Sequence, residues 1–135
     1  MSGKTPLETV DQLMEAINRG NIDAAMELYE PNATLVPEPG KLAIGTIALR
    51  QALQVFMGIK PNLKGEKNET ILVGELALFC SQWTFSGKAP DGTPVAMAGK
   101  SADILRRQAD GRWRIVLDNP WGTEILSQKE ASATA

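Results

Sequence analysis

Two aspartates, Asp103 and Asp118, lie among apolar residues near the end of the 135-residue sequence. Segment 100–122 reads as two strands joined by Asp110-Gly111, a dipeptide that is typical of tight hairpin turns. In that hairpin the two aspartates lie opposite each other. Two carboxyl groups in an apolar site raise the pKa of one of them, so one can donate a proton while the other accepts one. The pair is therefore the candidate catalytic group, and its chemistry would be acid-base chemistry.

A purely structural role for the same two carboxyl groups is the alternative. Arg107 or Arg114 would neutralise them through an ion pair, or Asp118 would accept hydrogen bonds from backbone amides near Trp121. Neither arrangement would perform a reaction.

The length of the turn decides how the two strands pair. A two-residue turn pairs Leu105 with Val116 and places both aspartates on one face. A three-residue bulged turn shifts the pairing by one residue and moves Asp118 to the other face from Asp103. We prefer the two-residue turn because it gathers four apolar side chains on one surface. These are Ile104, Trp113, Ile115 and Leu117.

Both faces of this hairpin then carry apolar residues, whereas a sheet with one solvated face alternates clearly between apolar and polar residues. The simplest cover for the second face is another copy of the chain. The surface made by Ile104, Trp113, Ile115 and Leu117 is therefore the predicted homodimer surface.

Composition narrows the classes of function. The net charge is -2 without a basic stripe, which argues against nucleic acid as a partner. The sequence has no secretory signal and no apolar run of the roughly 20 residues that a membrane helix needs, so we expect a cytoplasmic protein with no membrane partner. The absence of histidine excludes Ser-His and Cys-His catalysis and most transition-metal sites. We expect neither a metal nor an organic cofactor.

The elements that must position the aspartates can be read from periodicity. Thr5 to Glu8 form a capping box, and Gly20 ends the helix that follows. A short second helix extends to about Tyr29, and a third occupies about residues 47–57. A short strand is expected at 33–36, and long strands at about 66–73, 75–86, 95–108 and 112–119. This order predicts an α+β fold in which helices cover one face of a curved sheet.

The segments 16–23, with Leu28-Tyr29, 33–35 and 103–122 resemble the nuclear-transport-factor-2-like superfamily, in its SnoaL-like and ketosteroid-isomerase-like branch. The resemblance implies a cystatin-like cone, in which a strongly curved, mixed or antiparallel sheet wraps around three helices from the N-terminal half. It also implies an apolar pocket and frequent dimers. The domain is expected at 7–126, after an N-terminal extension at 1–6 and before a flexible C-terminal tail at 127–135.

The catalytic residues of the superfamily are carried over only in part. The resemblance to ketosteroid isomerases retains the penultimate-strand acid as Asp103, but places Leu13 at the tyrosine and Pro37 at the base. The resemblance to limonene-epoxide-hydrolase-like members retains Asp118, without the Arg-x-Asp partner near residues 80–83. Each known active site thus supplies one member of the pair.

Seven further residues are expected to bind a ligand in the pocket. Gln82 faces the pocket if its strand keeps the parity of the superfamily, whereas a one-residue insertion would turn Trp83 and Phe85 inward instead. Tyr29 is expected to place its hydroxyl at the rim, and Trp121 to close the mouth or to lock the tail. The predicted set is Leu13, Tyr29, Phe56, Gln82, Leu105, Val116 and Trp121.

Three functions remain open at this stage. The first is a SnoaL-like domain that binds a small apolar or oxygenated organic molecule. The second is an isomerase, lyase or hydrolase that uses Asp103 and Asp118 as an acid-base pair. The third is a noncatalytic, dimerising protein-interaction domain. Whether the chain is an enzyme is not decided by its sequence.

Overall fold

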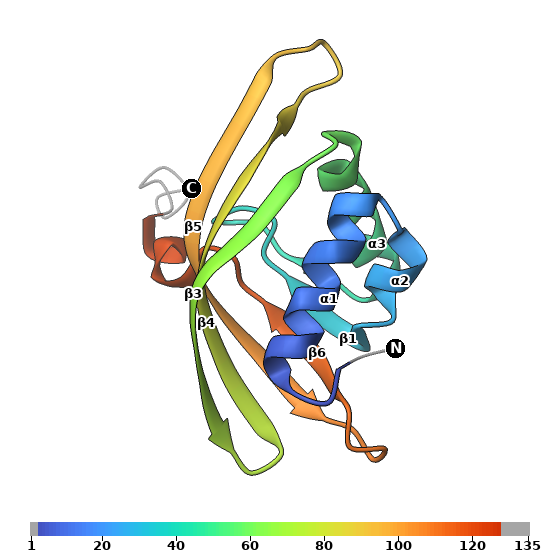
Figure 1. The fold of residues 1–135 in the computed structure, drawn as a ribbon, viewed down its shortest axis with the longest axis vertical. Coiled ribbons are helices and arrows are strands. Elements are labelled where there is room, and N and C mark those ends of the chain that lie inside the picture. Colours follow the sequence, from blue (N-terminus) through green and yellow to red (C-terminus); the bar gives the residue numbers. More distant parts are fainter. Residues whose placement is uncertain (1–2, 128–135) are drawn as a thin grey trace.

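The structure is a computed structural model that describes residues 3–127. Figure 1 shows a strongly bent sheet with all three α-helices on one side of it. The helices are α1 (Pro6–Arg19), α2 (Ile22–Met26) and α3 (Thr46–Gly58), and a short 3₁₀ helix, η1 (Gly122–Ser127), lies beside β5. The strands are β1 (Tyr29–Leu35), β2 (Ala43–Ile44), β3 (Asn62–Val73), β4 (Leu76–Lys88), β5 (Pro94–Arg107) and β6 (Trp113–Asp118). The predicted α+β class is confirmed.

The six strands form one mixed sheet in the order β2-β1-β6-β5-β4-β3. Only the β1–β6 pair is parallel, and the other neighbours are antiparallel. The predicted short strand at 33–36 is longer than expected, because β1 begins at Tyr29. Helix α2 ends at Met26, so Tyr29 belongs to the sheet and not to the second helix.

Helix α1 begins and ends where its capping residues dictate. The Thr5 hydroxyl accepts a hydrogen bond from the Glu8 amide at 3.1 Å, Pro6 occupies the first turn, and Gly20 ends the helix with a φ of 69°. The apolar stripe of α1, which includes Val10, is buried against the sheet. The capping box therefore fixes the element that covers the concave face.

The residues before α1 are bound to the sheet. The Trp113 amide donates to the Gly3 carbonyl at 2.9 Å, and the Thr9 hydroxyl donates to the Trp113 carbonyl at 2.9 Å. A Cβ atom on Gly3 would collide with the side chain of Glu8. The predicted extension at 1–6 thus contributes Gly3 to the edge of β6. Apart from Ser127, the predicted tail at 127–135 lies outside the described residues.

The β5–β6 hairpin combines the strand pairing of a two-residue turn with that of a three-residue turn. Beside the turn, Leu105 pairs with Ile115, as a three-residue turn requires, but Ile104 pairs with Leu117. Val116 is therefore an extra residue in β6, which is a β-bulge. The bulge offsets the one-residue shift of the turn, so Asp103 and Asp118 lie on the same, concave face. The preferred two-residue turn was wrong, although its consequence for the aspartates holds.

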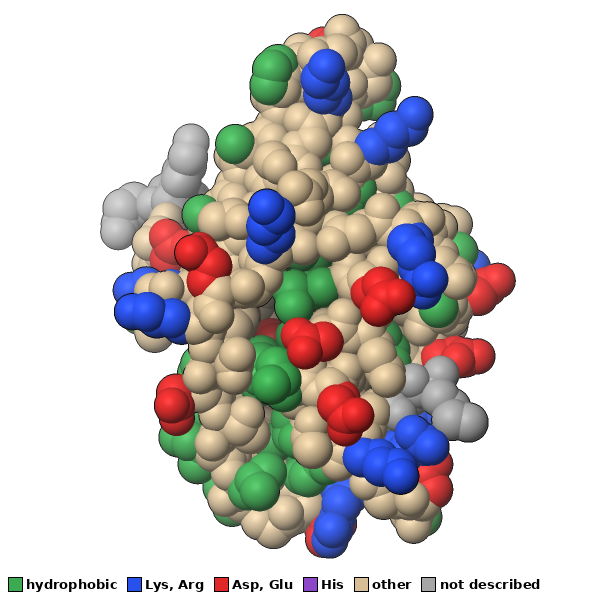
Figure 2. Space-filling model, in the orientation of Figure 1, with side chains coloured by type: hydrophobic (Ala, Val, Ile, Leu, Met, Phe, Trp, Pro, Cys, Tyr) green, Lys and Arg blue, Asp and Glu red, His purple; other side chains and the backbone are tan. Residues whose placement is uncertain are grey.

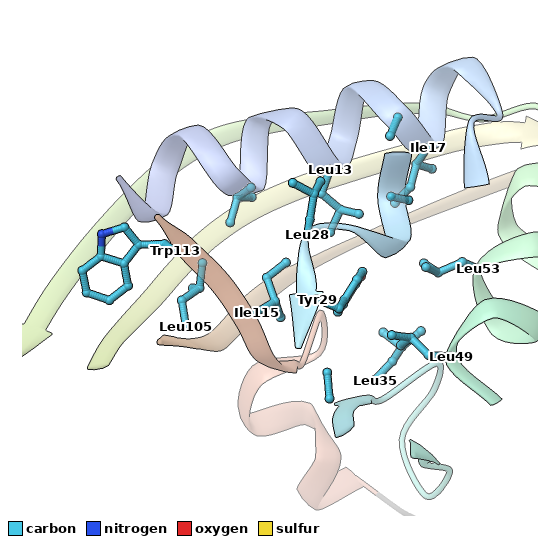
Figure 3. Close-up of a cluster of buried hydrophobic side chains, with 14 of the residues drawn as sticks. Leu13, Ile17, Leu28, Tyr29, Leu35, Leu49, Leu53, Leu105, Trp113 and Ile115 are labelled. Atoms are coloured by element: carbon cyan, nitrogen blue, oxygen red, sulfur yellow. The ribbon is translucent and has the colours of Figure 1, made fainter. Parts of the chain in front are cut away.

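The predicted dimer surface is wrong in two of its four residues for the same reason. Trp113 is 6% exposed and Ile115 is 1% exposed, because the shifted pairing turns both side chains into the core. Figure 3 shows them together with Leu105, on the side of the sheet that faces α1. Ile104 and Leu117 remain on the outer, convex face of the sheet.

Candidate functional site

A cavity of about 100 Å³ lies between α1, α3 and the concave face of the sheet. Its walls are mostly apolar, and Figure 2 shows hydrophobic side chains in the hollow at the centre of one face, with acidic side chains around it. The polar residues on its wall are Ser81, Ser101, Asp103 and Asp118. The cavity therefore combines an apolar body with a small polar region, as is usual for small-molecule sites.

The two aspartates meet inside this cavity. Asp103 is 6% exposed and Asp118 is 9% exposed, and the two carboxyl groups are close enough to shift each other's pKa. Asp103 Oδ1 also accepts a hydrogen bond from the Asn119 amide at 2.8 Å. The hydroxyl of Tyr29 donates to Asp118 Oδ2 at 2.6 Å. The result is a buried chain of three titratable groups that runs Tyr29–Asp118–Asp103.

Arginine does not neutralise the pair in the way that the structural alternative proposed. Arg107 binds Glu75 with two of its nitrogens. Arg114 pairs with Arg106 across the strands, on the outer face of the sheet. The backbone amide that reaches the pair belongs to Asn119 and binds Asp103, whereas the alternative had assigned such bonds to Asp118.

The surroundings separate the acidities of the two carboxyl groups. Burial raises the pKa of Asp103 well above its usual value, the charge of Asp118 raises it further, and the Asn119 amide opposes this rise. Burial also raises the pKa of Asp118, but the hydrogen bonds from Tyr29 and Asp103 lower it. Asp103 therefore keeps its proton to a higher pH than Asp118, so that where the pair holds one proton Asp103 is the acid and Asp118 the carboxylate.

Tyr29 stays protonated beside this carboxylate. Burial, and then the charge of Asp118, raise its pKa well above the usual value of a phenol. Its hydroxyl is buried below the cavity and not at the rim, because Tyr29 lies in β1 and points into the core with 2% exposure. The prediction of a rim hydroxyl is therefore wrong. Tyr29 does not line the cavity but holds one of the groups that do.

Replacing Tyr29 with phenylalanine removes this hydrogen bond and keeps the ring. We expect Tyr29→Phe to lower the free energy of unfolding by about 1.5–3 kcal/mol, the usual contribution of a hydrogen bond to a charged group. The pKa of Asp118 should rise, because a hydrogen bond that favours its ionised form is lost. Denaturant unfolding at neutral pH checks this value. An unchanged midpoint would show that the hydroxyl does not stabilise Asp118.

The raised pKa of Asp103 makes stability depend on pH. Above the ordinary carboxyl pKa of about 3.9, the folded chain still holds the Asp103 proton while the unfolded chain has lost it. Stability therefore falls as pH rises through this window, by about 1.4 kcal/mol for each unit of raised pKa. Asp103→Asn cannot ionise and keeps one donor and one acceptor, so it should stabilise the chain increasingly from pH 4.5 to pH 8.

Denaturant unfolding of the wild type and Asp103→Asn at both pH values measures this difference. Asp110→Asn is a matched control, because Asp110 lies exposed in the hairpin turn. An advantage of Asp103→Asn that is equal at the two pH values would contradict a raised pKa.

The structure brings only some of the predicted ligand-binding residues to the cavity. Leu13, Phe56 and Trp121 line it, and that they bind a ligand stays a prediction. Leu105 is on the same face of β5 as Asp103, but it is fully buried in the core and does not line the cavity. Val116 is the bulge residue and does not line it either.

Gln82 is on the wrong face for the predicted role. It pairs with Lys100 and lies with Thr84 in a groove on the outer side of the sheet. The pairing of β4 with β5 is regular, so Trp83 and Phe85 share the face of Asp103 and line the cavity. This is the alternative that the sequence left open, in which Trp83 and Phe85 face the pocket in place of Gln82.

Aromatic side chains make much of the cavity wall. Trp83 and Trp121 meet edge to face with ring centroids 5.3 Å apart, and the Trp83 indole donates to the Pro120 carbonyl at 2.7 Å. The indole of Trp121 donates to the Pro37 carbonyl at 3.2 Å. Both tryptophans are thus fixed in place by their polar edges, and both line the cavity. Phe56 and Phe85 form a second edge-to-face pair.

The sequence analysis missed Ser81 and Ser101 as cavity residues. Ser101 lies two residues before Asp103 on the same strand, so alternation alone places it on the same face. Ser81 is its cross-strand partner.

Other kinds of site find no support in the part of the chain that the structure describes. Residues 3–127 contain no group of three or more potential ligands that could hold a metal ion. No helix among them is long and apolar enough to cross a membrane.

Solved structures with the same fold come from proteins of different activities. An NTF2-like superfamily protein from Salmonella enterica is 19% identical, with a TM-score of 0.73, over 85% of this chain and 86% of that chain. A protein assigned as a ketosteroid isomerase from Shewanella frigidimarina is 20% identical, with a TM-score of 0.71, over 82% and 89%. A CaMKII hub from S. rosetta is 22% identical, with a TM-score of 0.68, over 83% and 89%. At these identities the likeness concerns the fold alone.

The fold is therefore the cone of the nuclear-transport-factor-2-like superfamily, as the sequence predicted. A model of the SnoaL-like domain matches residues 10–116, and the chain belongs to this family. A comparison with curated protein sequences found no match.

Proposed function

We propose that this SnoaL-like domain binds a small apolar organic molecule that carries oxygen, and moves a proton on it with Asp103 and Asp118. The observation that supports the proposal is the chain Tyr29–Asp118–Asp103 on the wall of an apolar cavity. It holds a neutral acid and a carboxylate side by side, which is the arrangement that acid-base catalysis requires.

The roles of the two carboxyl groups follow from their different acidities. Asp103 donates its proton in a hydrogen bond to a carbonyl or leaving oxygen of the bound molecule. Asp118 takes a proton from the carbon next to that oxygen, and the Tyr29 hydroxyl holds the carboxylate in position. The electron pair of the broken C–H bond moves toward the oxygen, where Asp103 stabilises the developing charge. This step is common to isomerases and to lyases that eliminate beside a carbonyl group.

Cyclohexanone is a suitable probe, because it is one apolar ring with one carbonyl oxygen. The protein should accelerate exchange of the α-protons of cyclohexanone for deuterium in D₂O, followed by loss of their ¹H NMR signal. General acid-base catalysis contributes about 10²–10⁴-fold. Saturable binding without any acceleration of exchange would contradict the proposed catalysis, and the protein would then be a small-molecule-binding domain. An absence of both binding and exchange would contradict the proposed function as a whole.

The outer face of the sheet supports a second function, self-association. Four apolar residues pair in one row across β3, β4, β5 and β6. They are Ile71, Leu78, Ile104 and Leu117. Ile71 is 57% exposed and Leu78 is 37% exposed, and a contiguous exposed apolar surface is typical of an interface. We propose that this row, in place of the predicted surface around Trp113, packs against a second copy of the chain.

The change Leu78→Lys with Ile104→Lys should convert a dimer into a monomer, because charged side chains would be buried in the interface. Sedimentation velocity at micromolar concentrations measures the mass of both proteins. Thr84→Lys is the control, since Thr84 is an exposed polar residue on the same face of β4. A wild type that stays monomeric at high concentration would contradict this interface.

The cytoplasmic location of the protein stays a prediction.

A further inference from the structure

Ser81 and Ser101 form a second polar pair on the cavity wall. They are directly paired on β4 and β5, and both line the cavity. Their hydroxyl oxygens are 2.7 Å apart, and the Ser81 amide donates to Ser101 Oγ at 3.1 Å. Ser101 is only 7% exposed. Neither hydroxyl has a part in the proton transfer proposed for the two aspartates.

One of the two hydroxyl protons of this pair has only a weak hydrogen-bond acceptor. The two hydroxyl groups carry two protons, and only one of them can lie between the two oxygens. The acceptor for the other, within the described residues, is the Ser81 carbonyl at 3.5 Å from Ser101 Oγ, which is at the outer limit for a hydrogen bond. A hydroxyl proton rotates to a better acceptor when one is present. The serine pair can therefore donate one hydrogen bond to a molecule in the cavity.

The distance between the two polar regions sets the length of that molecule. Ser101 and Asp103 are two residues apart on one face of β5, which separates them by about 7 Å along the strand. The rest of the cavity wall is mostly apolar and aromatic, with Phe56, Phe85 and Trp83. The cavity of about 100 Å³ is of the same order as an engineered cavity that admits benzene, about 150 Å³.

We infer that the cavity selects one-ring organic molecules with an oxygen atom at each end, one bound by Asp103 and the other by the hydroxyls of Ser81 and Ser101. The inference rests on the proposed function for its first contact, since one oxygen must lie at Asp103. The serine pair then distinguishes among molecules that already fit. A molecule that lacks the second oxygen leaves the donor of the serine pair without its better partner.

Two ketones of matched size test this selection. In 4-hydroxycyclohexanone and 4-methylcyclohexanone the ring and the carbonyl are the same, and a hydroxyl replaces a methyl group at the far end. Titrations followed by the amide NMR signals of the wild type should show tighter binding of the hydroxyl compound, by about threefold to tenfold for one neutral hydrogen bond. The methyl compound would bind more tightly in a cavity without such a donor, because it is less polar.

The double change Ser81→Ala with Ser101→Ala should reverse this order. Both serines must be changed together, because either hydroxyl alone would still carry a free proton. Loss of the acceptor for the Ser81 amide could unfold this variant, and the wild-type comparison does not depend on it. If the wild type binds 4-methylcyclohexanone as tightly or more tightly, the inference is overturned and the proposed function stands. If neither ketone binds, both are overturned.

Discussion

A chain that carries both Asp103→Asn and Asp118→Asn is expected to lose about 10²–10⁴-fold of its α-proton exchange activity toward cyclohexanone. Asparagine fills the same space and can still form hydrogen bonds, but it can neither take the carbon-bound proton nor donate an acidic one. The cavity should therefore still bind the ketone, with the exchange rate close to that of buffer. Initial rates in D₂O at several ketone concentrations separate the loss of rate from any loss of binding.

The matched control also replaces two carboxyl groups, but outside the cavity. Asp11→Asn with Asp23→Asn removes two exposed carboxylates of α1 and α2, and the ion pair of Asp23 with Arg50 is at the surface, where such pairs contribute little. This control should keep the exchange rate of the wild type. Full activity in the Asp103→Asn/Asp118→Asn variant would show that the pair is not the catalytic group.

The largest effect on stability is expected from Trp113→Ala. Trp113 is 6% exposed and belongs to the core beneath α1, where its removal leaves a cavity. Replacement of a buried tryptophan by alanine costs about 3–5 kcal/mol, which is a large share of the roughly 5–15 kcal/mol that stabilises a typical domain. Denaturant unfolding of the dilute protein, where association does not contribute, measures this loss.

Ile104→Ala is the matched control for that change. Ile104 belongs to the same hairpin but lies half-buried on the outer face. Its truncation should cost about 1 kcal/mol, as for a typical substitution outside the core. An equal loss in both variants would contradict the bulge at Val116, because it would return Trp113 and Ile104 to the same face.

The helices and the order of the strands could be predicted because their signals are local. The Thr5–Glu8 capping box and Gly20 bound α1, and alternating residues mark the long strands. The bulge at Val116 has no such signal, since no residue type is required there. The predicted pairing of the aspartates survived because the bulge and the three-residue turn shift the strands in opposite directions.

The two aspartates of the candidate site could be predicted from the sequence, but the residue that hydrogen-bonds Asp118 could not. Asp103 and Asp118 stood out as charges in apolar strands, but Tyr29 could not be linked to them. Tyr29 meets Asp118 only because β1 pairs in parallel with β6, a contact between distant parts of the sequence. The inward face of β4 was also undecided, because one side of its alternation carries Phe79, Trp83 and Phe85 and the other carries Leu78, Gln82 and Thr84, and either side could line a pocket.

The most direct test of the site is the protonation of the two aspartates at neutral pH. A titration of the side-chain ¹³Cγ signals, assigned with Asp103→Asn and Asp118→Asn, reports each carboxyl group by itself. The structure predicts that Asp103 keeps its proton to a higher pH than Asp118 and well above the ordinary carboxyl range, while Asp118 is the ionised member that Tyr29 hydrogen-bonds. Two signals that both titrate near the ordinary carboxyl pKa of about 3.9 would contradict the shared proton, and with it the acid-base role of the pair.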